Sequence, residues 1–203
     1  MDITPVTLEG EHVCLEPMRL DHVAALWRVG AEADIWRYMP YTMRSEEDMR
    51  RFMAAELARQ QAGLVCRFVT IARSITQPIG STSYLNIDRQ HRRLEIGGTW
   101  ITPAWQRSAV NTEAKYLQLT HAFESLGCLR VEFKTDSLNL KSRRALTRIG
   151  AVEEGTFRNH MVMPDGRLRH SVYFSIIDSE WPTVKAHLER LMASYGERAA
   201  GVR

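Results

Sequence analysis

Three strand-like segments with short connections between them limit most strongly what this chain can fold into. They are VCRFVTIAR at 65–73, PIGSTSYLNID at 78–88 and RRLEIGGTWIT at 92–102. Only SITQ and RQH separate them, and connections this short join antiparallel neighbours, because parallel strands need a long crossover. The sequence therefore predicts an antiparallel meander in the middle of the chain.

After this meander the pattern changes to alternating helices and strands. A helix over 112–126 connects the third segment to a strand at 129–136, and such a connection makes the two strands parallel. The other expected elements are a strand at 12–18, a helix from Asp21, helices at 45–61 and 140–149, strands at 150–161 and 168–177, and a helix at 179–195. The fold class is therefore α/β, with a mixed, mostly antiparallel sheet, one parallel strand pair and flanking helices.

Length and composition favour one ordinary globular domain. We expect the 203 residues to form a single domain over 1–203, since 44% hydrophobic residues suffice for one core of this size. A net charge of only +3, without a dense basic tract, argues against nucleic acid as a partner. Three widely separated cysteines without neighbouring histidines predict neither a disulfide framework nor a metal site.

The chain also lacks the usual membrane and export signals. No uninterrupted run of about 18 apolar residues occurs, and the first residues, MDITPVTLEG, contain neither a basic nor an apolar signal-peptide region. We therefore expect no membrane partner and a cytoplasmic location.

Two adjacent glycines, Gly97 and Gly98, interrupt the third strand of the meander. Such a pair often marks a bulge, or a place where a ligand or another backbone comes close; the alternative is that it only permits a twist. A strand that separates from its neighbour here would offer N–H and C=O groups to an amide-containing ligand. Strict alternation would place side chains on two faces: Leu94, Ile96 and Trp100 on one, and Glu95, Thr99 and Ile101 on the other.

The turn QRSAVNT at 106–112 follows this strand and leads into a helix. A helix start presents unpaired N–H groups and a positive dipole, so the amides from Arg107 to Thr112 are placed to bind a phosphate, with the Arg107 guanidinium beside them. The alternative is ordinary capping, with Asn111 as the N-cap before Thr112.

A second polar group precedes the helix at 140–149. Asn139 and Ser142 lie on the same helical face as Leu146 and Ile149. These two polar residues either cap the helix or face a cleft beside the glycine-containing strand. The neighbouring Arg143 is placed to reach either a phosphate or solvent.

These motifs resemble those of the GNAT N-acetyltransferase superfamily, and within it the branch of ribosomal-protein N-terminal acetyltransferases. The likeness runs from about residue 8 to 180 and is strongest over EIGGTWITPAWQRSAVNTEA and RVEFKTDSLNLKSRRALTRIGAVEEGTFR. The family's loop usually reads Gln/Arg-x-x-Gly-x-Gly/Ala, whereas this chain has Gln106, Ala109 and Asn111 at those positions. The second motif, NxxSxxxLxxxGF, is present from Asn139 onward, with Ala151 in place of the aromatic residue.

The resemblance implies acetyl-CoA as cosubstrate and no metal. Its pyrophosphate would be bound by the loop residues Arg107, Ser108, Ala109, Val110, Asn111 and Thr112. Its pantetheine would pair with the strand at Trp100, Ile101 and Thr102, and Asn139, Ser142 and Arg143 would complete the cofactor-binding set. Alanine at 109 is compatible with this loop at negative φ, and asparagine at 111 tolerates the left-handed region.

The resemblance also implies candidate catalytic residues. Glu95 is the candidate general base, acting directly or through water; the alternative is a cross-strand ion pair with an arginine. Many relatives protonate the leaving sulfur with a tyrosine, but Leu146 stands at that position, so Ser142 is the available hydroxyl and Asn139 orients it or the pantetheine.

The acceptor site would be walled by an aromatic segment. Trp36, Tyr38 and Tyr41 are the candidates for this wall, together with Glu95; an apolar anchor or a dimer contact would give the same pattern. We expect structural or substrate-lining roles for His160 and His170.

The resulting hypothesis is an acetyl-CoA-dependent N-acetyltransferase acting on a primary amine, which is either a peptide or protein N-terminal α-amine or a small amine. The alternative is a non-catalytic module that binds or senses acyl-CoA on the same fold. Relatives often dimerise, so a homodimer is expected as well.

Overall fold

The strands of the described residues lie in one twisted sheet. The computed structural model describes the backbone of residues 1–200 and the side chains of residues 1–195. The sheet has eight strands in the order β1-β2-β3-β4-β5-β6-β8-β7. The strands are β1 (Leu8–Glu9), β2 (Val13–Pro17), β3 (Cys66–Ala72), β4 (Gln77–Asp88), β5 (Arg93–Ile101), β6 (Arg130–Asp136), β7 (Val152–Val162) and β8 (Leu168–Ile177).

Every neighbouring pair is antiparallel except β5 and β6, which run parallel. The predicted meander consists of β3, β4 and β5, and the predicted parallel pair is β5 and β6. The mixed, mostly antiparallel α/β fold is therefore confirmed. Only the short strand β1 was absent from the sequence prediction.

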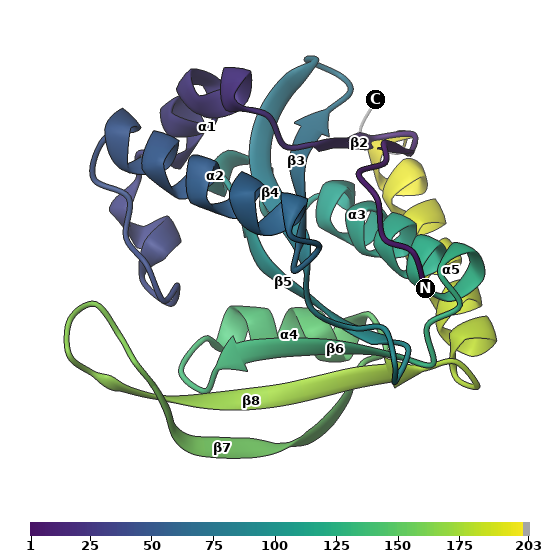
Figure 1. Cartoon of the computed structure of the whole chain (residues 1–203). Helices are drawn as coiled ribbons and strands as arrows, with labels where there is room; N and C mark the ends of the chain where they lie inside the picture. Colours follow the sequence, from purple (N-terminus) through teal and green to yellow (C-terminus); the bar gives the residue numbers. More distant parts are fainter. Residues whose placement is uncertain (201–203) are drawn as a thin grey trace.

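The helices cover the sheet unevenly (Figure 1). They are α1 (Val23–Gly30), α2 (Glu46–Gln61), α3 (Ala109–Thr120), α4 (Leu140–Arg148) and α5 (Trp181–Ala200). Helices α1 and α2 share one apolar cluster with Val69 and Trp100 of the sheet, whereas α3, α4 and α5 share the larger cluster on the opposite face. The strands β6, β8 and β7 are thus left without a helix on the α1 and α2 side.

Local sequence explains where the helices begin. The Ser45 side chain accepts a hydrogen bond from the Asp48 amide at the start of α2, as the sequence pattern predicts. Helix α3 starts earlier than expected: Ser108 is its N-cap, so the alternative with Asn111 as N-cap is wrong. Serine's oxygen reaches an amide of the first turn, which leaves Asn111 inside the helix.

The glycine pair in β5 forms a bulge that reverses the alternation of the strand. The pairing of β4 with β5 shifts between Ser81↔Trp100 and Ser83↔Gly97, and Gly98 has a φ of +57°. Beyond the bulge, Ile101 joins the cluster of Leu94, while Trp100 joins the opposite one. The strict alternation expected from the sequence is therefore wrong past Gly98, because one extra residue moves every later side chain to the other face.

The parallel strands β5 and β6 separate just before this bulge. Their pairing ends at Glu95↔Glu132, so the rest of β5 pairs only with β4. The two strands thus separate toward their carboxyl ends, which is where ligands bind in open α/β sheets.

Substitution of Gly98 tests how strongly the bulge depends on glycine. A Cβ at Gly98 would lie 2.7 Å from Nη1 of Arg67, a buried side chain bonded to Glu56. We expect Gly98→Ala to lower the free energy of unfolding by about 2–4 kcal/mol in urea titrations, from left-handed strain and displacement of the guanidinium.

Gly127→Ala is the matched control, because Gly127 has a φ of +66° and nothing within 4 Å of an added Cβ. Gly127→Ala should lower the free energy of unfolding only by the conformational strain, about 1 kcal/mol. Equal losses in the two variants would contradict the proposed contact with Arg67.

Candidate functional site

The free edge of β5 is the first component of the site. Trp100 and Ile101 pair with Ser81 and Gly80 of β4, and the Thr102 amide donates to the Ile79 carbonyl at 2.8 Å. On the other edge, the Ile101 carbonyl accepts a hydrogen bond from Gln106 Nε2 at 3.1 Å. The predicted ligand-pairing segment therefore has one edge that no strand covers.

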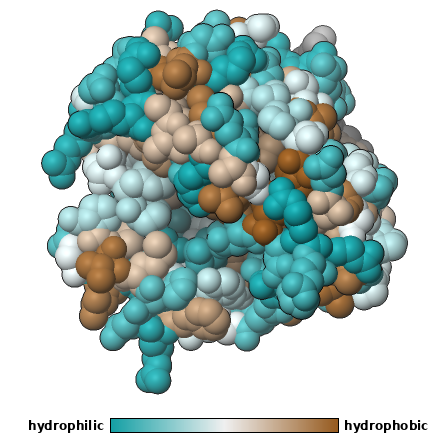
Figure 2. Space-filling view, in the orientation of Figure 1, coloured by the Kyte–Doolittle hydropathy of each residue, from teal (hydrophilic) through white to brown (hydrophobic). Residues whose placement is uncertain are grey.

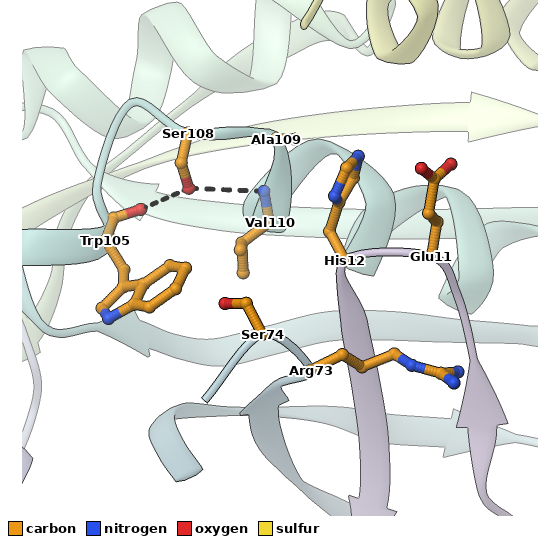
Figure 3. Close-up of a pocket in the computed structure, with 8 residues that line it drawn as sticks. All are labelled: Glu11, His12, Arg73, Ser74, Trp105, Ser108, Ala109 and Val110. Atoms are coloured by element: carbon orange, nitrogen blue, oxygen red, sulfur yellow. Dashed lines mark hydrogen bonds between the residues drawn. The ribbon is translucent and has the colours of Figure 1, made fainter. Parts of the chain in front are cut away.

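The N-terminus of α3 lies directly after this edge. The Ser108 hydroxyl donates to the Trp105 carbonyl at 2.7 Å and accepts from the Val110 amide at 3.4 Å (Figure 3). The residues around it border a hollow of about 370 Å³, lined by Glu11, His12, Arg73, Ser74, Trp105, Ser108, Ala109 and Val110. The lining combines the start of α3 with one cation, Arg73, and one carboxylate, Glu11. Helix amides beside an arginine suit an anion.

The conformation of this loop explains how it forms without glycine. Ala109 and Asn111 both lie inside α3, and neither has a positive φ. The left-handed residue is instead Arg107, with a φ of +63°. The helical conformation of Ala109 is that of any ordinary residue, and Asn111 does not need the left-handed tolerance expected of it.

Two members of the predicted loop set point into the protein. Val110 is 2% exposed and lies in the core, and Thr112 is fully buried. The Thr112 hydroxyl accepts a hydrogen bond from Arg148 Nη2 at 2.8 Å, which connects α3 to α4. Only backbone groups of these two residues are thus placed to meet a ligand.

The residues before α4 form a cap. The Ser142 amide donates to Asn139 Oδ1 at 3.1 Å, so Asn139 is the N-cap, the first of the two alternatives. Ser142 and Asn139 are half-buried, and no described residue bonds to the Ser142 hydroxyl. Arg143 lies 3.1 Å from Glu153, so its guanidinium already has an anionic partner.

Glu95 is almost completely buried beside the separating strands. Its Oε2 accepts a hydrogen bond from Asn86 Nδ2 at 2.7 Å and lies 3.3 Å from Lys134 Nζ. An ion pair was expected as an alternative, but its cation is a lysine and not an arginine. The other oxygen, Oε1, accepts no hydrogen bond from the described residues and lies 2.6 Å from the place of a Gly97 Cβ. Glycine at 97 therefore leaves the space that this oxygen occupies.

Several ionisable side chains of β6, β7 and β8 share the face of Glu95. Lys134 lies over the ring of Tyr173, 5.9 Å from its centroid, and Tyr173 contacts His160 at 5.8 Å between centroids. Burial raises the pKa of Tyr173, while desolvation, followed by the charges of Lys134 and Arg169, lowers the pKa of His160. Both side chains are therefore neutral at pH 7. Nδ1 of the second predicted histidine, His170, accepts a hydrogen bond from the Asn159 amide at 2.8 Å.

The predicted aromatic wall is only partly exposed. Trp36 is 3% exposed, donates from Nε1 to the Gly30 carbonyl and packs on Trp100, so it contacts core residues. The Tyr41 ring borders a hollow of about 380 Å³, lined by Tyr41, Thr42, Met43, Arg44, Asp48, Arg51, Phe52 and Pro164. Tyr38 contributes its carbonyl to Arg169. Figure 2 shows a recess between the side of the molecule with α1 and α2 and the side with β7 and β8.

Lys115 is a buried cation that the sequence reasoning missed. It lies on α3, is 5% exposed and donates to Thr82, Thr99 and Gln118 at 3.0–3.2 Å. No carboxylate of the described side chains forms a salt bridge with it, and burial lowers its pKa to about 7. Its spacing of four residues from the core residue Leu119 was the available sequence signal.

Two expected absences concern the described part of the chain only. No helix among these residues has the length and apolar character needed to cross a membrane. Nor do the described His, Cys, Asp and Glu side chains gather into a group of three that suits a metal ion.

Known proteins resemble the chain in sequence and in fold. The family model described as "Acetyltransferase (GNAT) domain" matches residues 12–152. The curated protein named "Putative ribosomal N-acetyltransferase YdaF", from Bacillus subtilis (strain 168), is 35% identical over 102 residues, covering 50% of this chain and 55% of that protein. The match thus spans about half of that relative's length.

Solved structures share the fold over nearly the whole chain. A GCN5-related N-acetyltransferase from Brucella melitensis has a TM-score of 0.87 and 27% identity, covering 94% of this chain and 86% of that chain. Mycobacterium smegmatis RimJ in complex with CoA-disulfide has a TM-score of 0.80 and 22% identity, covering 94% of this chain and 95% of that chain.

Lys115 gives a pH-dependent stability that can be measured. The pKa of Lys115 is about 7 in the folded protein and 10.5 in the unfolded chain. Burial of the charged ammonium therefore lowers the stability by its full amount below pH 7, and this loss becomes smaller as the pH rises above 7. Relative to Lys115→Met, wild type should gain up to about 1.4 kcal/mol of unfolding free energy per pH unit above pH 7. Urea titrations from pH 6 to 9 measure this gain.

The exposed Lys141 on α4 provides the control. Lys141→Met should follow the pH profile of wild type throughout this range. A constant difference between wild type and Lys115→Met would show that Lys115 keeps the same protonation in both states.

Proposed function

The chain belongs to the GNAT acetyltransferase family, and on this premise we propose that it transfers the acetyl group of acetyl-CoA to a primary amine. The acceptor is an N-terminal α-amine of a peptide or protein, or a small amine. The observation that carries the proposal is the separation of β5 from β6 beyond Glu95 and Glu132, with the N-terminus of α3 after the free edge.

The cosubstrate fits the two parts of this arrangement. Of the predicted pairing residues Trp100, Ile101 and Thr102, Ile101 is the one whose backbone faces the uncovered edge of β5, because the Thr102 amide is bonded to the Ile79 carbonyl and the bonding direction alternates along a strand. The Ile101 amide is the proposed partner of the pantetheine arm, since its carbonyl already accepts a hydrogen bond from Gln106. The first-turn amides of α3 and the Arg107 guanidinium suit the pyrophosphate. The structure of RimJ, which shares the fold, is a complex with CoA-disulfide, and this supports a CoA derivative as the ligand of the present protein.

Glu95 is the proposed base. Direct transfer forms a C–N bond and breaks the C–S bond of the thioester, so the amine must lose a proton while the sulfur leaves as a thiolate. Glu95 Oε1 is the free carboxylate oxygen, while Asn86 and Lys134 hold Oε2. An α-amine has a pKa of about 8, so this proton transfer requires only a modest base.

The residues of α4 have supporting roles in this proposal. Ser142 supplies a hydroxyl for the leaving thiolate, whose thiol pKa of about 8.5 makes a strong acid unnecessary. Asn139 positions Ser142 through the cap. Since Arg143 is paired with Glu153, we assign it a weaker contact with the cofactor than Arg107.

The acceptor, the assembly and the location remain proposals. The name of the YdaF relative makes a ribosomal protein N-terminus one candidate acceptor. Tyr41 and Tyr38 are the proposed wall residues, with Trp36 supporting them from the core. A homodimer and a cytoplasmic location stay predictions.

The ion pair of Glu95 with Lys134 is the observation that favours the second candidate, a non-catalytic acyl-CoA-binding module. In such a module Glu95 would serve only as the structural partner of Lys134, and its free oxygen Oε1 would have no role. Formation of an acetylated product with any amine separates the two functions, because a sensing module binds acetyl-CoA without turnover.

Calorimetry with acetyl-CoA and CoA tests the pyrophosphate site. We expect Ser108→Asp and Ala109→Asp to weaken binding at least about tenfold, because each adds a negative charge beside the ligand. Aspartate at 108 preserves the cap, so α3 should still form. The control is Thr183→Asp, which adds the same charge in the first turn of α5. Unchanged affinity in both loop variants would place the cofactor elsewhere.

The pH profile of acetylation tests the base. Glu95→Gln should lower the rate about 10²-fold at pH 7 and less at pH 9, where more of the acceptor amine is already neutral. Glu132→Gln removes a carboxylate from the neighbouring strand and should leave the shape of the profile unchanged. An identical profile for wild type and Glu95→Gln would remove Glu95 from the mechanism.

A further inference from the structure

Arg169 on β8 is a buried cation without an anionic partner. The side chain is 4% exposed, and its guanidinium bonds only to neutral oxygens. Nε donates to the Ser171 hydroxyl at 3.0 Å, and Nη1 donates to the Tyr38 carbonyl at 3.2 Å. Among the described residues, no carboxylate lies within salt-bridge distance of it.

The neighbouring carboxylates are already neutralised. Asp136 and Glu95 are the acidic groups whose charges act on Arg169. Asp136 lies 2.6 Å from Arg167, and Glu95 lies 3.3 Å from Lys134. Each anion thus has its own cation, and the charge of Arg169 is left over. A buried charge is costly unless something pairs with it.

The same guanidinium has one nitrogen available to a ligand. Nη2 forms no hydrogen bond with the described residues. Three described side-chain atoms lack both solvent exposure and a hydrogen-bond partner: Tyr41 Oη, Gln118 Nε2 and Thr120 Oγ1. Nη2 of Arg169 is not among them. Nη2 therefore contacts solvent although the residue as a whole is buried, and Tyr38 and Ser171 fix its direction.

Arg169 lies on the acceptor side of the proposed site. It is close enough to Glu95, Tyr173 and His160 for their charges or dipoles to be coupled. This face of β6 and β8 carries no helix, so an acceptor whose amine reaches Glu95 passes over it. His160 adds no competing positive charge at neutral pH, because its pKa is lowered.

We propose that the acceptor carries a carboxylate close to its amine, and that Arg169 binds this carboxylate through Nη2 while the amine faces Glu95 Oε1. The inference rests on the proposed function and names its substrate class, an anionic amine. Two sources share this chemistry: the α-carboxylate of a free amino acid, and the side chain of an aspartate or glutamate at a peptide N-terminus.

Matched acceptors test the proposal with wild-type protein and acetyl-CoA. One pair is alanine and alaninamide, and the other is two peptides that differ only in Asp or Asn at the first residue. We expect kcat/KM, compared at equal concentrations of neutral amine, to favour the anionic member at least about tenfold in one of the pairs. The pair that responds identifies the source of the carboxylate. Equal rates within both pairs would overturn the proposal.

The Arg169 variants assign the preference to this residue. Arg169→Gln should reduce the preference to about threefold or less, because kcat/KM falls more for the anionic member than for the neutral one. Arg169→Lys keeps the positive charge and should retain part of the preference. This variant tests the proposal if Arg169→Gln does not fold. Arg158→Gln, an exposed arginine on β7, is the control and should keep it fully. An undiminished preference in Arg169→Gln would assign it to another residue.

Calorimetry separates this inference from the proposed function. If neither pair is acetylated although acetyl-CoA binds, the proposed transfer fails. The affinities of the CoA-bound protein for the members of both pairs, alanine with alaninamide and the Asp with the Asn peptide, then decide the inference alone. Tighter binding of the anionic member of either pair that Arg169→Gln abolishes would support the carboxylate site, and equal affinities within both pairs would refute it.

Discussion

The bulge at Gly97 and Gly98 is the constraint on which the rest of the site depends. Gly98 takes a left-handed conformation against the Arg67 guanidinium, and Gly97 leaves room for Glu95 Oε1. The bulge turns Trp100 onto the α1 and α2 side, where it packs on Trp36. The bulge begins two residues after Glu95, the last residue that β5 pairs with β6, so the strand bends where the two strands separate.

Buried charges surround this bulge on both faces of the sheet. Arg67 is paired with Glu56 on the α2 side, and its Nη1 also donates to Ser83. Lys115 on the α3 side and Arg169 on the open side have hydroxyl, amide or carbonyl partners only. Burying an unpaired charge opposes folding. Lys115 reduces this cost through its lowered pKa of about 7, whereas the charge of Arg169 on the open side is one that an anionic ligand would offset.

Helix α3 connects these elements to the edge of the sheet. Its Glu113 carboxylate accepts hydrogen bonds from the amides of Glu11, His12 and Val13 at 2.7–2.8 Å. A carboxylate that satisfies three backbone donors fixes the helix firmly, because each of these bonds is charge-assisted. The N-terminus of α3 is therefore held in place beside the free edge of β5, which is the preorganisation an anion site needs.

The sequence by itself determined the order of the helices and of every strand except β1, and the parallel pair, since short connections and periodicity act locally. It also singled out Glu95, and it offered a bulge at the adjacent glycines and a cap at Asn139 as one of two alternatives each. It was wrong about the face of Trp100 and about Asn111 as a cap, because a single extra residue and a cap one turn earlier are decided by pairing and packing. Only the tertiary structure brought Lys134 to Glu95 and left Arg169 without an anion. These pairs lie on different strands, and their charge balance depends on distances that no local pattern encodes.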